Sequence, residues 1–185
     1  DAAEAAAAGE WGSKLSRLLG ICGARARRGD KVVVFSAWTR LLNLAGSALE
    51  AHDLPVASLV GSPEKKREAL AAFARAAKRG GAAVLLVPLF GGASGAGGGG
   101  AAGLTLTHAN TAVILEPSLT PGIEAQAAGR ISRIGQTKAA KVIRLIVADT
   151  VEEKILEWQA RRMDSGTNKS AQLSLNDFVQ LGLSA

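Results

Sequence analysis

The run Lys31-Val-Val-Val-Phe35 decides the fold, because it is short, apolar and rich in β-branched residues. Such a run predicts a strand that is buried on both faces, as in the middle of a parallel sheet. Further apolar runs of this kind lie at residues 56–60, 83–87, 111–115 and 142–147. Segments with helical spacing of apolar residues alternate with the strands and cover residues 13–28, 38–51, 63–78, 120–135 and 150–163. This order predicts an α/β fold, a parallel β-sheet flanked by helices on both faces.

Right-handed crossovers between parallel strands place the loops after the strands along one edge, where ligands bind. Two helix starts support the assignment. Ser62-Pro63-Glu64 combines a serine cap, a proline in the first turn and an acid favoured by the helix dipole. Thr150-Val-Glu-Glu153 has the pattern of a capping box.

Composition limits the class of protein. The 185 residues suit one domain, and a net charge of +6 favours a polyanionic partner such as nucleic acid. The lone Cys22 excludes an internal disulfide framework and is expected to be a small buried hydrophobe. No apolar run approaches the roughly 18 residues that span a bilayer, so we expect no membrane partner. The chain begins at an aspartate, and we interpret it as a fragment of a larger protein.

The expected organisation has three parts. Residues 1–11 are read as a linker, formed by a frayed segment or a helix, residues 12–163 as one α/β lobe, and residues 164–185 as a polar linker that ends in a docking helix at 174–181.

The segment Gln126-Ala-Ala-Gly-Arg-Ile-Ser-Arg-Ile-Gly-Gln136 carries the chemistry. Helical spacing would place Gln126, Arg130 and Arg133 on one face. Gly129 leaves room for a group to approach the backbone, while the two isoleucines of the segment are expected to enter the core. Two converging guanidiniums suit the oxygens of a phosphate, which they can bind through forked hydrogen bonds.

This segment, continued by Thr137 and Lys138, resembles motif VI of the superfamily-two helicases, in the Q-A-x-G-R-x-x-R-I-G-Q-T form of the SWI/SNF-type DNA translocases. The resemblance implies a RecA-like, P-loop NTPase-like second lobe that supplies arginine fingers to ATP bound on the first lobe.

Other stretches extend the resemblance in the expected order. Residues 31–39 resemble motif IV, residues 103–110 resemble motif V, and residues 150–155 match the T-V-E-E-K-I that closes the lobe. Further matches lie at residues 12–15, 61–67 and 116–121. Glu116-Pro117 and the Val-Pro pair after Leu86 are similar to the SHPRH-type ubiquitin ligases, which carry a RING finger ahead of this lobe. That branch implies a ubiquitin-conjugating enzyme as a partner, bound through a RING outside this chain.

The chain also departs from the family pattern. A glycine-rich stretch at 90–102 separates motif V from its strand, and its G-x-G-x-x-G match is interpreted as a low-complexity insertion. Ala37 replaces the motif IV glutamine, and Leu119 and Thr120 replace the W-N of the usual D-P-x-W-N-P.

The chain contains no G-x-x-x-x-G-K-[ST] loop and no D-E-x-H motif. It therefore cannot by itself hold ATP with Mg²⁺, which we assign to a missing N-terminal RecA-like lobe, and the fragment alone is predicted to be inactive. The expected catalytic residues are Arg133 as the finger, Arg130 as a second phosphate contact, and Gln126 as the group that orients Arg130 or the attacking water. Gly103 and Gly129 are expected to lie beside the phosphates. No metal ligands are predicted, because His52 and His108 are isolated.

The resemblance places the DNA contacts on the opposite side of the cleft. Hydroxyls and backbone N–H groups there would position phosphates without reading bases. The candidates are Ser36, Trp38, Gly61, Ser62, Arg67 and Thr105. Four of the six have a structural alternative: a strand-end cap for Ser36, a helix cap for Ser62, a solvated charged face for Arg67, and the core for Trp38, which is the reading favoured for that residue.

The predicted function is that of the C-terminal lobe of an ATP-dependent translocase on double-stranded DNA or nucleosomes, acting in chromatin remodelling or DNA repair in the nucleus. One alternative is a non-catalytic scaffold lobe of a RING-type ubiquitin ligase. The other is an RNA helicase lobe, against which the R-I-G-Q-T string argues.

Overall fold

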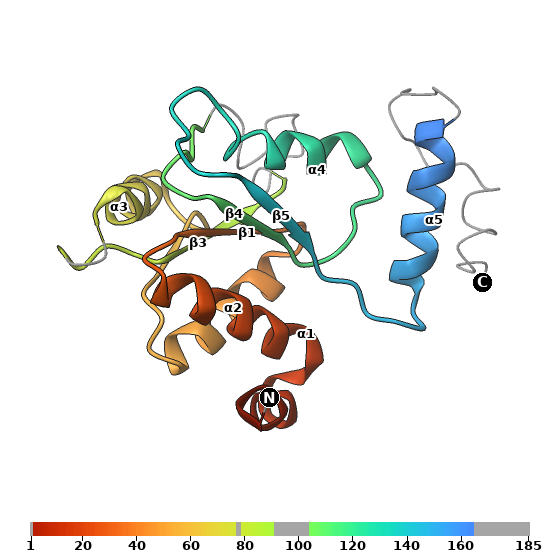
Figure 1. The fold of residues 1–185 in the computed structure, drawn as a ribbon, viewed down its shortest axis with the longest axis horizontal. Helices are drawn as coiled ribbons and strands as arrows, with labels where there is room; N and C mark the ends of the chain where they lie inside the picture. Colours follow the sequence, from red (N-terminus) through yellow and green to blue (C-terminus); the bar gives the residue numbers. More distant parts are fainter. Residues whose placement is uncertain (1, 77–78, 91–103, 165–185) are drawn as a thin grey trace.

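Five parallel strands form one sheet in the order β2-β3-β1-β4-β5 in the computed structural model (Figure 1), which describes residues 2–76, 79–90 and 104–164. The strands are β1 (Val32–Ser36), β2 (Val56–Ser58), β3 (Val84–Pro88), β4 (Thr111–Ile114) and β5 (Lys141–Arg144). The predicted parallel α/β sheet is therefore confirmed.

The central strand β1 shows why the sheet forms. It pairs with β3 on one side and with β4 on the other, so that Val32 lies opposite both Val84 and Thr111. Every residue of β1 is buried. Alternate side chains enter different layers: Val32 and Val34 join one hydrophobic core, and Val33 and Phe35 join the other.

Helices cover both faces of the sheet (Figure 1). On one side lie α1 (Ala2–Arg27) and α2 (Thr39–Ala51), whose leucines pack with the first core. On the other side lie α3 (Pro63–Ala74) and α4 (Pro121–Ala128), which pack with the second core. The last helix, α5 (Val151–Asp164), stands at the side of the sheet beyond β5 in the view of Figure 1.

The predicted helix starts form with one change of detail. The Ser62 side chain accepts a hydrogen bond from the Lys65 N–H at 3.4 Å, as a cap should. At α5, Thr150 Oγ1 accepts from the Glu152 N–H at 3.2 Å, and the Glu153 carboxylate accepts from the Asp149 N–H at 3.0 Å. In each of these two hydrogen bonds, the backbone N–H that donates lies one residue before the N–H used in an ideal capping box.

The N-terminal part of the chain is helical, one of the two forms expected for it. Helix α1 begins at Ala2 and is interrupted at Gly12, whose φ of 77° is outside the helical region. The expected boundary between residues 11 and 12 is therefore a break within helical structure. Cys22, on the second part of α1, is buried, and burial raises the pKa of its thiol to about 12.

Helix α3 is shorter than predicted. It ends at Ala74 because Arg75 adopts an extended conformation with a ψ of 144°. The Lys31 ammonium donates to the carbonyl oxygens of Phe73 and Arg75, so a lysine from the start of β1 satisfies the last carbonyls of the helix.

The helix predicted for residues 120–135 is wrong in its second half. Helix α4 ends at Ala128, with Gly129 as its cap, and residues 130–135 form turns. The Arg130 carbonyl accepts from the Leu106 N–H at 2.9 Å, so a tertiary contact takes the acceptor that a continuing helix would use. As expected, Ile131 is buried, but Ile134 is fully exposed, contrary to the core role predicted for it.

Three predictions fall wholly or almost wholly outside the described residues: the glycine-rich insertion, Gly103, and the linker and docking helix of 164–185. No helix in the described part of the chain has the length and apolar character needed to cross a membrane.

The two cores make a stability prediction. Leu85 is fully buried in β3, so Leu85→Ala should lower the free energy of unfolding by about 2–5 kcal/mol, through lost burial and the cavity left behind. Urea denaturation measures the change. Leu44→Ala on α2 is the matched control, since Leu44 is 47% exposed and its loss should cost less than about 0.5 kcal/mol. Equal effects of the two substitutions would contradict the assigned core.

Candidate functional site

The two arginines of the signature segment lie beside residues 104–107. The Arg130 carbonyl accepts from the Leu106 N–H at 2.9 Å, and Arg133 Nη1 donates to Thr105 Oγ1 at 3.3 Å. Two stretches that the sequence identified separately, motif V and motif VI, are therefore neighbours. The structure joins them through turns rather than through the single helical face that was predicted.

One side-chain amide fixes this junction. Gln136 Nε2 donates to the carbonyl oxygens of Ala109 at 2.6 Å, Ile131 at 3.2 Å and Thr107 at 3.3 Å. Its Oε1 accepts from the Lys138 N–H at 2.9 Å. Sequence reasoning quoted Gln136 but gave it no role. The feature that could have indicated a role for this residue is its side-chain amide, which both donates and accepts hydrogen bonds and directly follows a glycine turn.

The charges of the two guanidinium groups are not paired with an acid within the described residues. Arg130 is half-buried, and its Nε is buried without a hydrogen-bond partner; Arg133 is exposed apart from its contact with Thr105. In the part of the chain that the structure describes, neither forms an ion pair. An unpaired buried donor on a permanently charged group is costly, which favours a site completed by an external anion.

Gly129 is required neither by backbone conformation nor by internal packing. Its φ is −63°, which any residue adopts, and an added Cβ would meet only the carbonyl oxygens of Ala125 and Gln126 at 3.4 Å. Gln126 is exposed, and no hydrogen bond links it to Arg130 within the described residues.

A buried polar cluster that the sequence did not reveal supports α4. Glu124 Oε1 accepts from the Ser118 N–H at 2.6 Å and from Gln159 Nε2 at 2.8 Å. Glu124 Oε2 lies 2.9 Å from Arg144 Nε, an ion contact that lacks the alignment of a hydrogen bond. The cluster ties α4 to α5 and to β5, just before the arginine-bearing turns.

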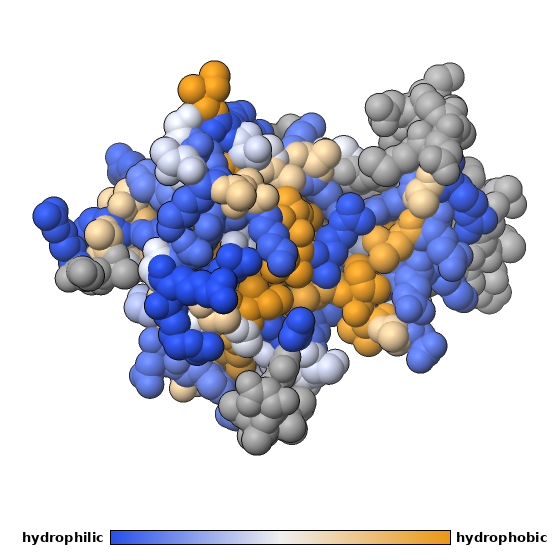
Figure 2. All heavy atoms as spheres, viewed as in Figure 1, coloured by the Kyte–Doolittle hydropathy of each residue, from blue (hydrophilic) through white to orange (hydrophobic). Residues whose placement is uncertain are grey.

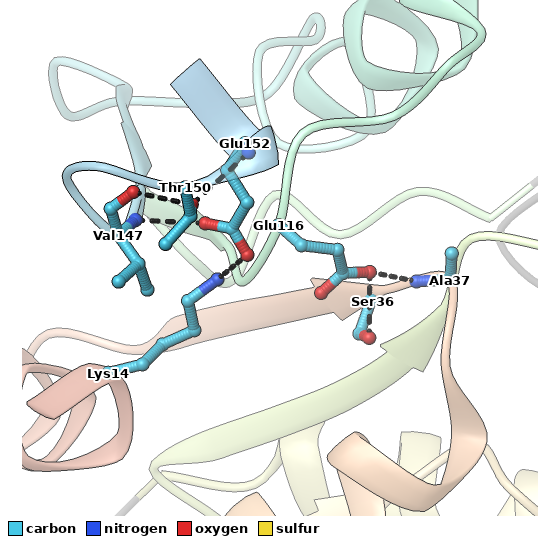
Figure 3. A network of polar contacts seen from close by, with 7 residues as sticks. All are labelled: Lys14, Ser36, Ala37, Glu116, Val147, Thr150 and Glu152. Carbon is cyan, nitrogen blue, oxygen red and sulfur yellow. Dashed lines mark hydrogen bonds and ion pairs between the residues drawn. The ribbon is translucent and has the colours of Figure 1, made fainter. Parts of the chain in front are cut away.

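A second buried carboxylate lies at the carboxyl end of the sheet (Figure 3). Glu116 Oε1 accepts from Ser36 Oγ at 2.9 Å and from the Ala37 N–H at 2.5 Å, while its Oε2 is buried without a hydrogen-bond partner among the described residues. Burial raises the pKa of the Glu116 carboxyl, an effect partly offset by these hydrogen bonds. Ser36 is fully buried, so its hydroxyl holds Glu116 and is not presented to a phosphate.

Next to this carboxylate, Lys14 pairs with Glu152 (Figure 3). Glu152 also accepts from the Val147 N–H at 2.9 Å. The predicted entry to the lobe and its closing T-V-E-E-K-I helix are thereby joined. A basic residue from α1 and an acid from the first turn of α5 make that closure.

The remaining DNA candidates are distributed over the surface. Trp38 is 68% exposed, so the core reading favoured for it is wrong. Gly61, with a φ of 125°, and Ser62 form the turn after β2, and exposed Arg67 lies 3.6 Å from the Glu64 carboxylate. Thr105 is not with them, because it contacts Arg133.

Neither histidine has ligand geometry. His52 Nδ1 lies 2.9 Å from the Ala48 carbonyl at the end of α2, a helix-capping contact. Among the described residues no group of three or more histidine, cysteine, aspartate or glutamate side chains could hold a metal ion.

The parallel sheet and the neighbouring motif V and motif VI segments match the predicted class of protein, a helicase C-terminal domain. The chain belongs to the helicase conserved C-terminal domain family, whose model matches residues 13–135. The crystal structure of the C-terminal part of the Fun30 ATPase domain shares the fold, with a TM-score of 0.66 and 22% identity over 90% of this chain and 47% of that one.

Curated relatives refine the assignment. DNA repair protein RAD5A of Arabidopsis thaliana is 36% identical over 158 residues, 83% of this chain and 14% of that protein. E3 ubiquitin-protein ligase SHPRH of Homo sapiens is 34% identical over 146 residues, 79% of this chain and 8% of that protein. DNA repair protein rad8 of Schizosaccharomyces pombe is 35% identical over 135 residues, 72% of this chain and 11% of that protein. The predicted SWI/SNF-type family and its SHPRH-like branch are confirmed, and the chain spans only a small part of these relatives.

The Gln136 contacts make a testable prediction. Gln136→Ala leaves three backbone carbonyls without their amide donor, so the free energy of unfolding should fall by about 1–3 kcal/mol. Hydrogen exchange should also become faster in residues 104–110 and 130–138. Gln126→Ala is the control, because Gln126 is exposed and should change stability by less than about 0.5 kcal/mol. Unchanged hydrogen exchange in both segments after Gln136→Ala would contradict the role of Gln136 in fixing the junction.

The raised pKa of Glu116 predicts a pH dependence. A carboxyl whose folded pKa lies above its unfolded value stabilises the fold below the unfolded pKa and loses that contribution as pH rises through the folded pKa. Urea unfolding between acid and neutral pH should therefore show wild type losing stability relative to Glu116→Gln as pH rises. Gln can still accept the two hydrogen bonds but carries no charge to bury. A difference that stays constant with pH would contradict the assignment.

Proposed function

We propose that this chain is the second lobe of an ATP-dependent translocase on double-stranded DNA, acting in DNA repair or chromatin remodelling. One observation carries the proposal: Arg130 and Arg133 are held beside residues 104–107 with no ion pair in the described part of the chain. Family membership supports it, as do relatives named as DNA repair proteins. These named relatives do not favour the RNA helicase alternative.

The residues fit a nucleotide phosphate on structural grounds. The buried Nε of Arg130 lacks a partner among the described residues, Gly129 adds no side chain next to it, and Arg133 is exposed at the neighbouring turn. ATP bound with Mg²⁺ on the N-terminal lobe would supply the phosphoanhydride to be cleaved. We assign the metal to that lobe.

Each residue then has a defined task. Arg133 places its guanidinium against the charge that develops on the transferring phosphoryl group, and the Thr105 hydroxyl holds Arg133 in position beforehand. Arg130 contributes a second cation from its half-buried position. Gln126, exposed on α4, is assigned to orienting Arg130 or the attacking water once the lobes close. Gly103, in the segment before Leu104, is assigned to the phosphate with Gly129.

The DNA side is assigned to the carboxyl edge of the sheet. Trp38 and the Gly61-Ser62 turn follow β1 and β2, and Arg67 extends from α3. The N–H groups of the turn and the cation would hold backbone phosphates, and exposed Trp38 would pack against the sugar–phosphate chain. Ser36 supports this edge through Glu116 and does not contact DNA.

The SHPRH-like branch of the family suggests further partners and a cellular location for the whole protein. SHPRH is named as a ubiquitin ligase. We assign to the whole protein a RING outside this chain, a ubiquitin-conjugating enzyme that binds it, and a nuclear location, where nucleosomal DNA is available. The lobe's direct partner within the protein is the N-terminal RecA-like lobe.

The decisive test uses the full-length protein. Arg133→Ala should lower DNA-stimulated ATP turnover by roughly 10³–10⁵, about 4–7 kcal/mol of barrier, because the transition-state cation is lost. Affinity for ATP should stay within several-fold, measured with a fluorescent nucleotide. Arg161→Ala, which removes an exposed arginine from α5, is the matched control and should leave turnover unchanged.

Near-normal turnover in Arg133→Ala would remove the finger assignment. Absence of DNA-stimulated turnover in the unmodified full-length protein would instead favour the non-catalytic scaffold of a RING-type ubiquitin ligase.

A further inference from the structure

The outer edge of the sheet at β5 is open. β5 pairs with β4 on one side, and no strand in the described part of the chain pairs with its other side. The Lys141 N–H bonds to the Asn110 carbonyl at 2.8 Å and the Leu145 N–H to the Ile114 carbonyl at 2.9 Å. Because inward and outward groups alternate along a strand, the N–H and C=O groups of Val142 and Arg144 face outward.

This edge forms one wall of a groove, and α1 forms the other. The first part of the groove, about 500 Å³, runs beside Lys141, Val142 and Ile143. A second part, about 550 Å³, continues beside residues 144–148, and Arg17 lines both. Figure 2 shows apolar surface gathered over β5, with hydrophilic surface on either side. The groove therefore follows the open backbone edge along its whole length.

The groove carries positive charge and no acid of its own. Its lining includes Arg17, Arg25, Arg28, Lys141 and Arg144, and no aspartate or glutamate among the described residues. Arg25 lies 3.7 Å from Asp30, and Arg144 lies 2.9 Å from Glu124. Arg28 and Lys141 are exposed.

The floor of the groove is apolar. Ile21 and Ile143 are partly buried on the α1 face of the sheet, and Val142, which is 44% exposed, projects from the opposite face of β5. Alternating apolar and charged side chains around an open strand edge match an extended peptide, which gains ladder hydrogen bonds and buries alternate side chains. A DNA backbone would use the cations but would leave the apolar strip and the outward carbonyls without partners. The chemistry therefore favours a polypeptide over a nucleic acid.

We propose that the α1–β5 groove binds an extended acidic segment of a partner protein, which adds to β5 as a sixth strand. Acidic side chains of the segment would meet the arginines of α1 and Lys141, and its apolar side chains would cover Val142. This surface lies at the opposite end of the strand order from β2 and α3, where part of the DNA side was assigned. The proposal does not depend on the ATPase assignment.

The test uses the 185-residue chain and the peptide acetyl-EVDVEVE-amide. We expect binding with a Kd below about 1 mM at low salt, measured by fluorescence anisotropy, with amide NMR shifts concentrated in residues 141–147 and 17–28. The basic peptide acetyl-KVKVKVK-amide should bind at least about tenfold more weakly. Added salt should weaken the acidic peptide, because the pairing charges are exposed.

Two variants separate the backbone and charge contributions. Val142→Pro removes an outward N–H, leaves the inward ladder bonds intact, and should weaken peptide binding at least about tenfold. Circular dichroism checks that the variant folds. If it does not fold, the double variant Arg28→Glu with Lys141→Glu, which reverses the charge of two exposed residues, replaces it in the test. This variant should weaken binding of the acidic peptide by a similar factor. Lys65→Glu, on exposed α3, is the matched charge control and should leave binding unchanged.

The opposing outcomes are distinct. Lack of peptide binding at about 1 mM would overturn the proposal. The cations would then serve only to prevent other chains from pairing with the edge strand. Shifts at β5 with a short DNA duplex but not with the peptide would assign the groove to nucleic acid. Dimers of the chain that Val142→Pro abolishes would assign it to a second copy.

Discussion

The hydrogen bonds of the Gln136 amide are the constraint on which the candidate site depends. The backbone carbonyls of residues 107, 109 and 131 belong to two separate turns, and one side chain satisfies all three. Turns have no ladder of their own to hold them, so the position of the two arginines relative to motif V depends on this group, together with the Leu106–Arg130 backbone bond and the Thr105–Arg133 contact. The geometry of the site is therefore a property of tertiary contacts rather than of helix α4.

Around this junction, support comes from parts of the chain beyond the segment that carries the family signature. The family match ends at residue 135, yet Gln136, Glu152 and Gln159 all lie after it. Gln159 on α5 secures Glu124 on α4, and Glu152 closes the lobe onto α1 through Lys14. The last described helix thus acts as a brace for the turns that carry the arginines.

Much of the fold could be predicted from local pattern. Lys31-Val-Val-Val-Phe35 and the apolar runs at 83–87 and 111–115 became strands because burial on both faces leaves little choice of conformation. The helix over residues 120–135 could not be predicted to its end, because the Arg130 carbonyl is taken by Leu106, a residue outside any local window. The burial of Ser36 reversed expectation for a similar reason. Its hydroxyl donates to Glu116, whose position after β4 is fixed by the sheet order.

The burial of Cys22 has a practical consequence. It is the only cysteine in this chain, and with a thiol pKa of about 12 it carries almost no thiolate at neutral pH. Maleimide reagents, which attack the thiolate, should leave it unmodified while labelling a cysteine introduced at exposed Ile134. The native chain thus offers a nearly silent background on which a fluorophore or spin label at the arginine turn could report its approach to a nucleotide in solution.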